Sequence, residues 1–195
     1  KDEAWRFSGN VLNALLLALT LFSALLILFA PFLIYLVAPG FDKASHDLTV
    51  KISRILFLSP FLLGVSAFAS TLLQAFSRFL ITSLAPIFYN LGIIFGIMFL
   101  TPKFGIWGLA YGVILGAFLH LLIQLPSLYS IGFRPFNGIN LRDVGLAKVV
   151  KLWLPRTFGL AALQVNSIVI TAIASVLSTG SIAIFNFADN LRWVP

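Results

Sequence analysis

The chain has 195 residues, of which 60% are hydrophobic and only 10% are charged. A water-soluble domain of this size carries about 25% charged residues, so this sequence lacks the polar side chains needed to cover a surface in water and belongs in a bilayer. The net charge of +7 does not indicate nucleic-acid binding, because the basic residues are scattered at the ends of apolar runs without interleaved aromatic residues. The absence of cysteine excludes disulfides and thiolate metal sites.

The two ends of the sequence predict an internal piece of a longer membrane protein. The first residues, "KDEAWRFSGN", have neither an initiator methionine nor the basic, apolar and small-residue pattern of a signal peptide. The last residues, "FNFADNLRWVP", stop within an apolar run that has no polar cap.

Six apolar runs predict six helices, because about 20 apolar residues span the hydrocarbon core as a helix. They cover about residues 11–37, 52–76, 80–100, 105–125, 149–177 and 182–195, the last one truncated. The runs do not alternate as barrel strands do, and lipid-exposed backbone must satisfy its own hydrogen bonds. We therefore expect an all-α, polytopic transmembrane bundle, with residues 1–195 forming a single transmembrane region.

The distribution of basic residues predicts an orientation. When alternate helix ends are assigned to opposite sides, eight Lys and Arg residues fall on one side and four on the other. The positive-inside rule then places the N-terminus and the loop of residues 127–148 in the cytoplasm. Two interpretations of that loop stay open: an ordinary basic loop, or a short interfacial amphipathic helix with Leu141, Val144 and Leu146 facing lipid.

The fourth run carries its smallest and its most polar residues at four-residue steps. These are Gly108, Gly112, Gly116, His120 and Gln124. Residues four apart share a helix face, so the glycines predict a groove for close helix packing. His120 and Gln124 continue this face toward something polar.

Other polar side chains in the apolar runs need partners, because an amide in lipid is costly. For Asn90, Gln124, Gln164 and Asn166 two interpretations stay open, interhelical hydrogen bonding and a hydrated cavity. Four prolines within these runs predict kinks or hinges that suit a rocking transporter: Pro31, Pro60, Pro86 and Pro155.

The charged side chains in or beside the apolar runs also have two interpretations, partners within the protein or headgroups on one hand and a water-filled path or substrate on the other. Asp189 and Arg192 lie within the sixth run, where charges normally face an interior or a water-filled path, although residues three apart can also pair with each other. Arg78 and Arg156, at predicted cytoplasmic helix ends, either snorkel to headgroups or attract an anionic substrate. No metal-ligand spacing or phosphate-binding loop is present, so we expect no enzyme, no metal and no cofactor.

Several stretches resemble the MurJ (MviN) lipid II flippases of the multidrug/oligosaccharidyl-lipid/polysaccharide exporter superfamily. They are "LVAPGFD" at 36–42, "LLQAFSRFLITSLAPIFYN" at 72–90, "GLAYGVILGAFLHLLIQLP" at 108–126, "VVKLWLPRTFG" at 149–159 and "FADNLRWVP" at 187–195. The resemblance covers nearly the whole chain and implies the third through seventh helices of such proteins, plus the start of the eighth.

The resemblance implies a flippase of the bacterial inner membrane that moves lipid II, an undecaprenyl-diphosphate-linked precursor, to the outer leaflet by alternating access. Its partners would be lipid II, membrane lipids and an unidentified coupling ion, and no nucleic acid. One departure is that Asn190 occupies the position of a family arginine and Trp193 that of an acidic residue, while Arg192 is displaced. The alternatives are another exporter of the superfamily (a polysaccharide-lipid flippase or a drug/cation antiporter) or a membrane scaffold that transports nothing.

Overall fold

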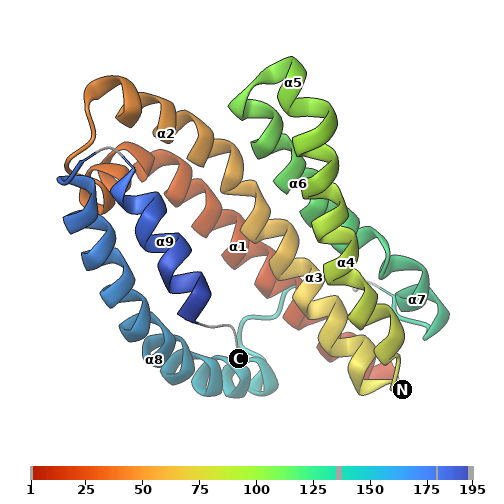
Figure 1. The fold of residues 1–195 in the computed structure, drawn as a ribbon. Helices are drawn as coiled ribbons and strands as arrows, with labels where there is room; N and C mark the ends of the chain where they lie inside the picture. The colour runs from red at the N-terminus through yellow and green to blue at the C-terminus, as the bar shows by residue number, and fades with distance from the viewer. Residues whose placement is uncertain (1, 135–137, 179, 193–195) are drawn as a thin grey trace. The chain divides into compact units, whose positions relative to one another are not determined.

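The computed structural model describes residues 2–134, 138–178 and 180–192, and the regular elements of this part are all helices (Figure 1). In chain order they are α1 (Asp2–Val37), α2 (Lys43–Leu56), α3 (Leu58–Ala75), α4 (Phe79–Phe95), the π-helix η1 (Gly96–Leu100), α5 (Thr101–Phe104), α6 (Ile106–Leu122), α7 (Leu125–Ser130), α8 (Val144–Ser175) and α9 (Ser181–Arg192). Five stretches of the described residues are long and apolar enough to cross a membrane: Glu3–Val37, Lys43–Ala75, Phe79–Phe104, Ile106–Ser130 and Val144–Ser175. The all-helical class predicted from the sequence is confirmed.

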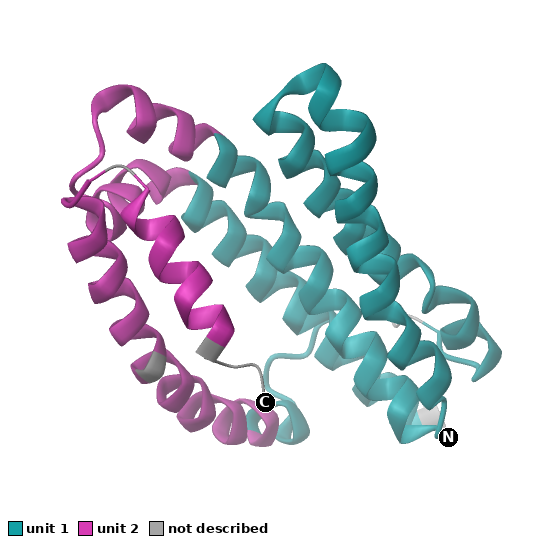
Figure 2. Ribbon diagram, viewed as in Figure 1, with its two compact units in different colours: residues 1–27, 52–147 teal, residues 28–51, 148–195 magenta. Residues whose placement is uncertain are grey.

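The helices divide into two compact units (Figure 2). Unit 1 comprises residues 1–27 and 52–147, and unit 2 comprises residues 28–51 and 148–195. That all 195 residues form one transmembrane region stays a prediction.

The second predicted helix, at 52–76, differs from the structure at its start and in its middle. Helix α2 already begins at Lys43, before the expected start at residue 52, because the Asp42 carboxylate accepts the Ala44 N–H at 3.1 Å and caps the first turn. The helix then breaks at Phe57, three residues before Pro60. Pro60 has no N–H for the carbonyl of Leu56 and crowds it, which accounts for the division into α2 and α3.

The third predicted helix continues past its expected end at residue 100. Pro102 cannot donate to the carbonyl four residues before it, and the Thr101 N–H instead reaches the carbonyl of Gly96, five residues back. This wide turn is the π-helix η1, after which α5 extends to Phe104. The chain reverses at Gly105, whose φ of 59° is one that glycine adopts without strain.

The expected loop 127–148 is shorter in the structure. Helix α7 includes residues up to Ser130, and α8 starts at Val144. The interpretation as a separate interfacial helix is therefore wrong for the residues of this loop that the structure describes. Residues 138–143 are not helical, and Leu146 is buried in the first turn of α8. The Asp143 carboxylate caps that turn by accepting the Leu146 N–H at 2.9 Å.

The apolar core of unit 1 gathers around four buried residues: Ala69, Leu73, Leu128 and Phe133. The Trp5 ring of α1 stacks on Phe76 with ring centroids 5.4 Å apart and meets Phe133 edge-on at 5.8 Å. This cluster fixes α1, α3 and α7 around the same end of unit 1. Pro31, Pro86 and Pro155 lie inside α1, α4 and α8, which continue through them, and their hinge role stays a prediction.

Candidate functional site

Helix α6 packs most extensively on α4 and η1, and Figure 1 shows α4 and α6 side by side. The three glycines of α6 lie at this contact. A methyl group added to Gly112 would lie 2.7 Å from the Cα of Gly96, and one added to Gly116 would overlap the carbonyl of Tyr89. Gly92 faces Gly116 in the same way. Backbone therefore meets backbone along this seam, and no side chain fits between the two helices.

Toward the other end of α6, a polar clasp joins α6 to α3. It consists of Ser66, Ser70, His120 and Gln124. The Gln124 amide donates to Ser66 Oγ at 2.6 Å and to the His120 carbonyl at 2.9 Å, and Gln124 Oε1 accepts the Ser70 hydroxyl at 2.8 Å. Ser66 and Gln124 are both fully buried.

The clasp also includes the imidazole of His120. Ser66 Oγ lies 2.6 Å from His120 Nδ1. The Ser66 hydroxyl proton can go either to Nδ1 or to the His120 carbonyl, which lies 3.2 Å away, so His120 joins the clasp whichever of its ring nitrogens carries the proton. The polar atoms of Gln124 are satisfied within the protein. Of the two interpretations of this amide, the geometry favours interhelical hydrogen bonding over contact with a hydrated chamber.

Most other predicted site residues have exposed side chains. In unit 1 these are Arg78, just before α4, and Asn90, on α4. In unit 2 they are Arg156, Gln164 and Asn166 on α8, and Asn190 on α9, while Asp189 is half-buried. None of these side chains has a hydrogen-bond or ion-pair partner within the part of the chain that the structure describes.

Arg192 ends α9, but its side chain and residues 193–195 lie outside the described residues, and so does its expected pairing with Asp189. Gln124 belongs to unit 1, whereas Gln164, Asp189 and Arg192 belong to unit 2. A hydrated cavity that is faced by Gln164, Asp189 and Arg192 stays a prediction.

Unit 2 contains a pocket of about 500 Å³ between the connector after α1 and the turn joining α8 to α9. Its polar lining is Asp42, Ser45, Ser175, Ser178, Ser181 and Asn186. Gly40 also lines the pocket and lies against α8: its N–H donates to Ser175 Oγ at 3.0 Å, and a side chain at this position would overlap the Ser175 carbonyl. Among the described residues, the lining of this pocket includes none of the site residues predicted from the sequence.

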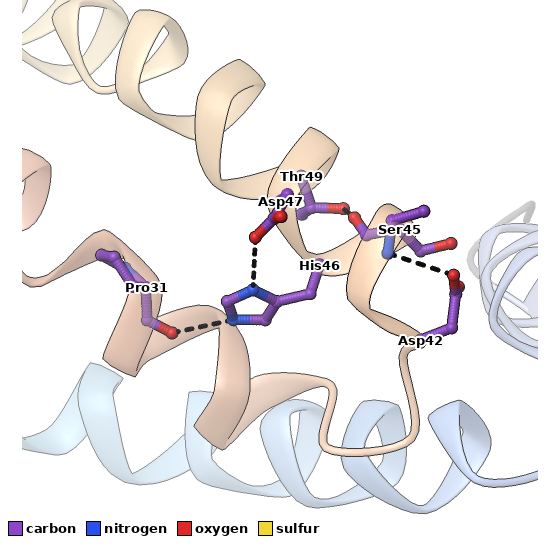
Figure 3. Close-up of polar contacts among 7 residues, drawn as sticks. Pro31, Asp42, Ser45, His46, Asp47 and Thr49 are labelled. Atoms are coloured by element: carbon purple, nitrogen blue, oxygen red, sulfur yellow. Dashed lines mark hydrogen bonds and ion pairs between the residues drawn. The ribbon is translucent and has the colours of Figure 1, made fainter.

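Two polar contacts at Pro31 were not predicted from the sequence. Proline leaves the carbonyl four residues earlier without its helical donor, and Arg54 Nε donates to that carbonyl, of Ile27, at 3.2 Å. On α2, His46 Nε2 lies 3.1 Å from the Pro31 carbonyl, and His46 Nδ1 lies 3.6 Å from Asp47 Oδ1 (Figure 3). The sequence did hold a signal for the first contact: Pro31 has no N–H for the Ile27 carbonyl four residues earlier, so this carbonyl needs another donor.

Hydrogen bonds at the start of α2 lower the pKa of Asp42, which lies outside the membrane-spanning stretches. The Ser45 side chain and the N–H groups of Ala44 and Ser45 donate to the Asp42 carboxylate and hold its pKa below the ordinary 3.8. Among the described residues, no three His, Asp or Glu side chains lie close enough together to hold a metal ion.

Comparison with known proteins gives a consistent result. The sequence model of one family, described as "Lipid II flippase MurJ", matches residues 1–195. The chain is similar to the "Probable lipid II flippase MurJ" of Buchnera aphidicola subsp. Schizaphis graminum, with 33% identity over 100% of this chain and 39% of that protein. It is 32% identical to the "Lipid II flippase MurJ" of Burkholderia cenocepacia, over 91% of this chain and 36% of that protein. The chain thus spans less than half the length of these relatives.

Proposed function

The chain belongs to the lipid II flippase MurJ family, and from this premise we propose that it forms part of a transporter that moves lipid II from the inner to the outer leaflet. It is a multi-pass membrane protein. We place it in the bacterial cytoplasmic membrane, with the start of α1 and residues 127–148 on the cytoplasmic side. The proposed step is the movement of an intact lipid, so no bond is made or broken and the protein is not an enzyme.

The observation that best supports this function is the exposure of polar residues on α8. Gln164 and Asn166 lie in a stretch apolar enough to span a membrane, yet both side chains are exposed. An amide without partners is costly in hydrocarbon. A water-filled path with a polar substrate headgroup would satisfy both side chains, whereas contact with lipid tails would not.

The exposed arginines suit the charge of the proposed substrate. Arg78 and Arg156 are both exposed, and a guanidinium can bind a diphosphate through paired, charge-assisted hydrogen bonds. Neutralising the anion lowers the cost of carrying it through a medium of low dielectric constant. In alternating access, Asn90, Asp189, Asn190 and Arg192 would join these residues along the headgroup path while the polyprenyl tail stays in lipid.

The function is tested in a bacterium depleted of its lipid II flippase and supplied with the full-length gene. We expect growth to be restored and lipid II to become accessible in the outer leaflet. Gln164→Leu should reduce that signal, whereas Val165→Leu, at an exposed apolar neighbour on α8, should not. Full-length protein that reaches the membrane but leaves lipid II in the inner leaflet refutes the proposal.

A further inference from the structure

Two asparagines of α1 bind the backbone of the segment that leads into α8. Asn10 makes a paired contact with Asn140: its Oδ1 accepts the Asn140 N–H at 2.7 Å, and its Nδ2 donates to the Asn140 carbonyl at 3.0 Å. One turn further along α1, Asn13 Nδ2 donates to the Gly138 carbonyl at 2.8 Å. We call these four residues the asparagine latch.

The latch continues into the first turn of α8 through a chain of hydrogen bonds. The carbonyl of Asn140 also accepts the Asp143 N–H at 3.3 Å, and Asn140 Oδ1 accepts the Arg142 N–H at 3.1 Å. Asp143 in turn caps α8 through the Leu146 N–H. The position of the α8 N-terminus therefore depends on the two asparagines of α1.

The hydrogen bonds of the latch are of a kind that water can replace. Asn10 is 4% exposed, but what it holds is irregular backbone bound through side-chain amides, and water can replace such bonds on separation. A pocket of about 700 Å³ lies beside the latch and is lined by Glu3, Arg6, Phe7, Asn10, Asn140, Asp143 and Gly145. Water in this pocket can reach both partners of the paired Asn10 contact.

We propose that the asparagine latch holds the start of α8 against α1 in one state of the transport cycle and releases it in another. The proposed release rests on the proposed function, because alternating access requires helices to separate from some neighbours and pack against others during the cycle. Asn10 and Asn13 act as positioning residues. They govern where α8 begins, and no contact with the transported lipid is assigned to them.

The first test measures the contact itself in the full-length protein. The Asn140 N–H donates to Asn10 Oδ1, so its exchange with deuterium reports how often this bond opens. Asn10→Leu removes this acceptor and also the second bond of the paired contact, so we expect it to raise the rate of deuterium labelling at the Asn140 N–H by about fivefold or more, the factor for losing one hydrogen bond. Thr20→Val is the matched control, because the Thr20 hydroxyl donates to the Leu16 carbonyl of its own helix and, among the described residues, takes no part in the latch. Equal labelling rates in Asn10→Leu and Thr20→Val overturn the latch.

The second test asks whether the latch must open. In Asn10→Cys/Asn140→Cys, oxidation should link the two residues and stop lipid II movement, and reduction should restore it, while Asn10→Cys alone should not respond to oxidation. A linked protein that transports at the unlinked rate, or a pair that never links, contradicts the proposal. Unmodified full-length protein that moves no lipid II defeats the proposed function instead, and the labelling rates still judge the contact.

Discussion

Helices α6 and α8 both lie in stretches that are long and apolar enough to span a membrane. They differ in whether their polar and small residues are buried or exposed. The glycines of α6, and Gln124 two residues after its end, are buried against α3, α4 and η1. On α8, Gln164, Asn166 and Gly159 are exposed or have no atoms near them. Similar residue types in similarly apolar helices are therefore used for close packing in one case and left exposed in the other.

The difference separates two needs of a membrane transporter. Small residues and satisfied amides let α6 pack closely where the hydrophobic effect gives no advantage over lipid. Polar side chains without partners, as on α8, cost free energy unless water, substrate or other protein covers them. We infer that α6 belongs to the rigid scaffold and that α8 carries the face on which function depends.

The largest expected effect comes from filling the glycine seam. Gly112→Leu places a side chain against the Gly96 backbone, which cannot move as a flexible side chain would, so we expect a loss of about 3 kcal/mol or more of folding free energy, at the upper end of overpacking costs. Gly159→Leu on α8 is the matched control, with nothing within 4 Å of the added carbon. Thermal unfolding of the full-length protein in detergent measures both. Equal melting temperatures would show that the seam opens without cost.

The sequence was sufficient for the features that depend on local pattern. The length of each apolar run predicts the membrane-spanning stretches, and the four-residue glycine step of α6 marks a close-packing face. The breaks at Phe57 and η1 follow from Pro60 and Pro102, whose consequences for the preceding carbonyls can be worked out locally.

The partners of polar residues were harder to predict because they depend on how helices are rotated against each other. Ser66 and Ser70 share the four-residue step of His120 and Gln124, so their pairing had a signal in the sequence. Asn10 had none, because it binds the backbone of Asn140, and a backbone acceptor leaves no mark on side-chain pattern.

The second prediction compares the two glutamines. Gln124→Leu leaves Ser66 and Ser70 without their buried partner, so we expect a loss of about 1–3 kcal/mol of folding free energy. Gln164→Leu should leave the melting temperature unchanged and reduce lipid II movement, because Gln164 is exposed. The comparison between α6 and α8 fails if Gln124→Leu keeps full stability and loses only transport.

A third prediction concerns Pro31, where a missing N–H is replaced by an arginine. Arg54→Met should cost about 1 kcal/mol, since it removes the donor to the Ile27 carbonyl. In a Pro31→Ala background the new backbone N–H can take that carbonyl, so the same change should cost almost nothing. A double-mutant cycle on unfolding free energies gives the coupling. If the cost of Arg54→Met is the same in both backgrounds, Arg54 does not substitute for the missing N–H.

The smallest expected effect is the pH dependence of the α2 cap. The donors from Ser45 and Ala44 lower the pKa of Asp42 below 3.8, so the ionised carboxylate is favoured in the folded protein. A lowered carboxyl pKa stabilises the fold at pH values above 3.8, and this contribution is lost as the pH falls through the folded-state pKa. Asp42→Ala should therefore lower the melting temperature at pH 7 and make less difference at pH 3. Because the carboxylate is fully exposed, water screens much of this effect, and a pH-independent difference would mean that the cap acts through geometry instead of charge.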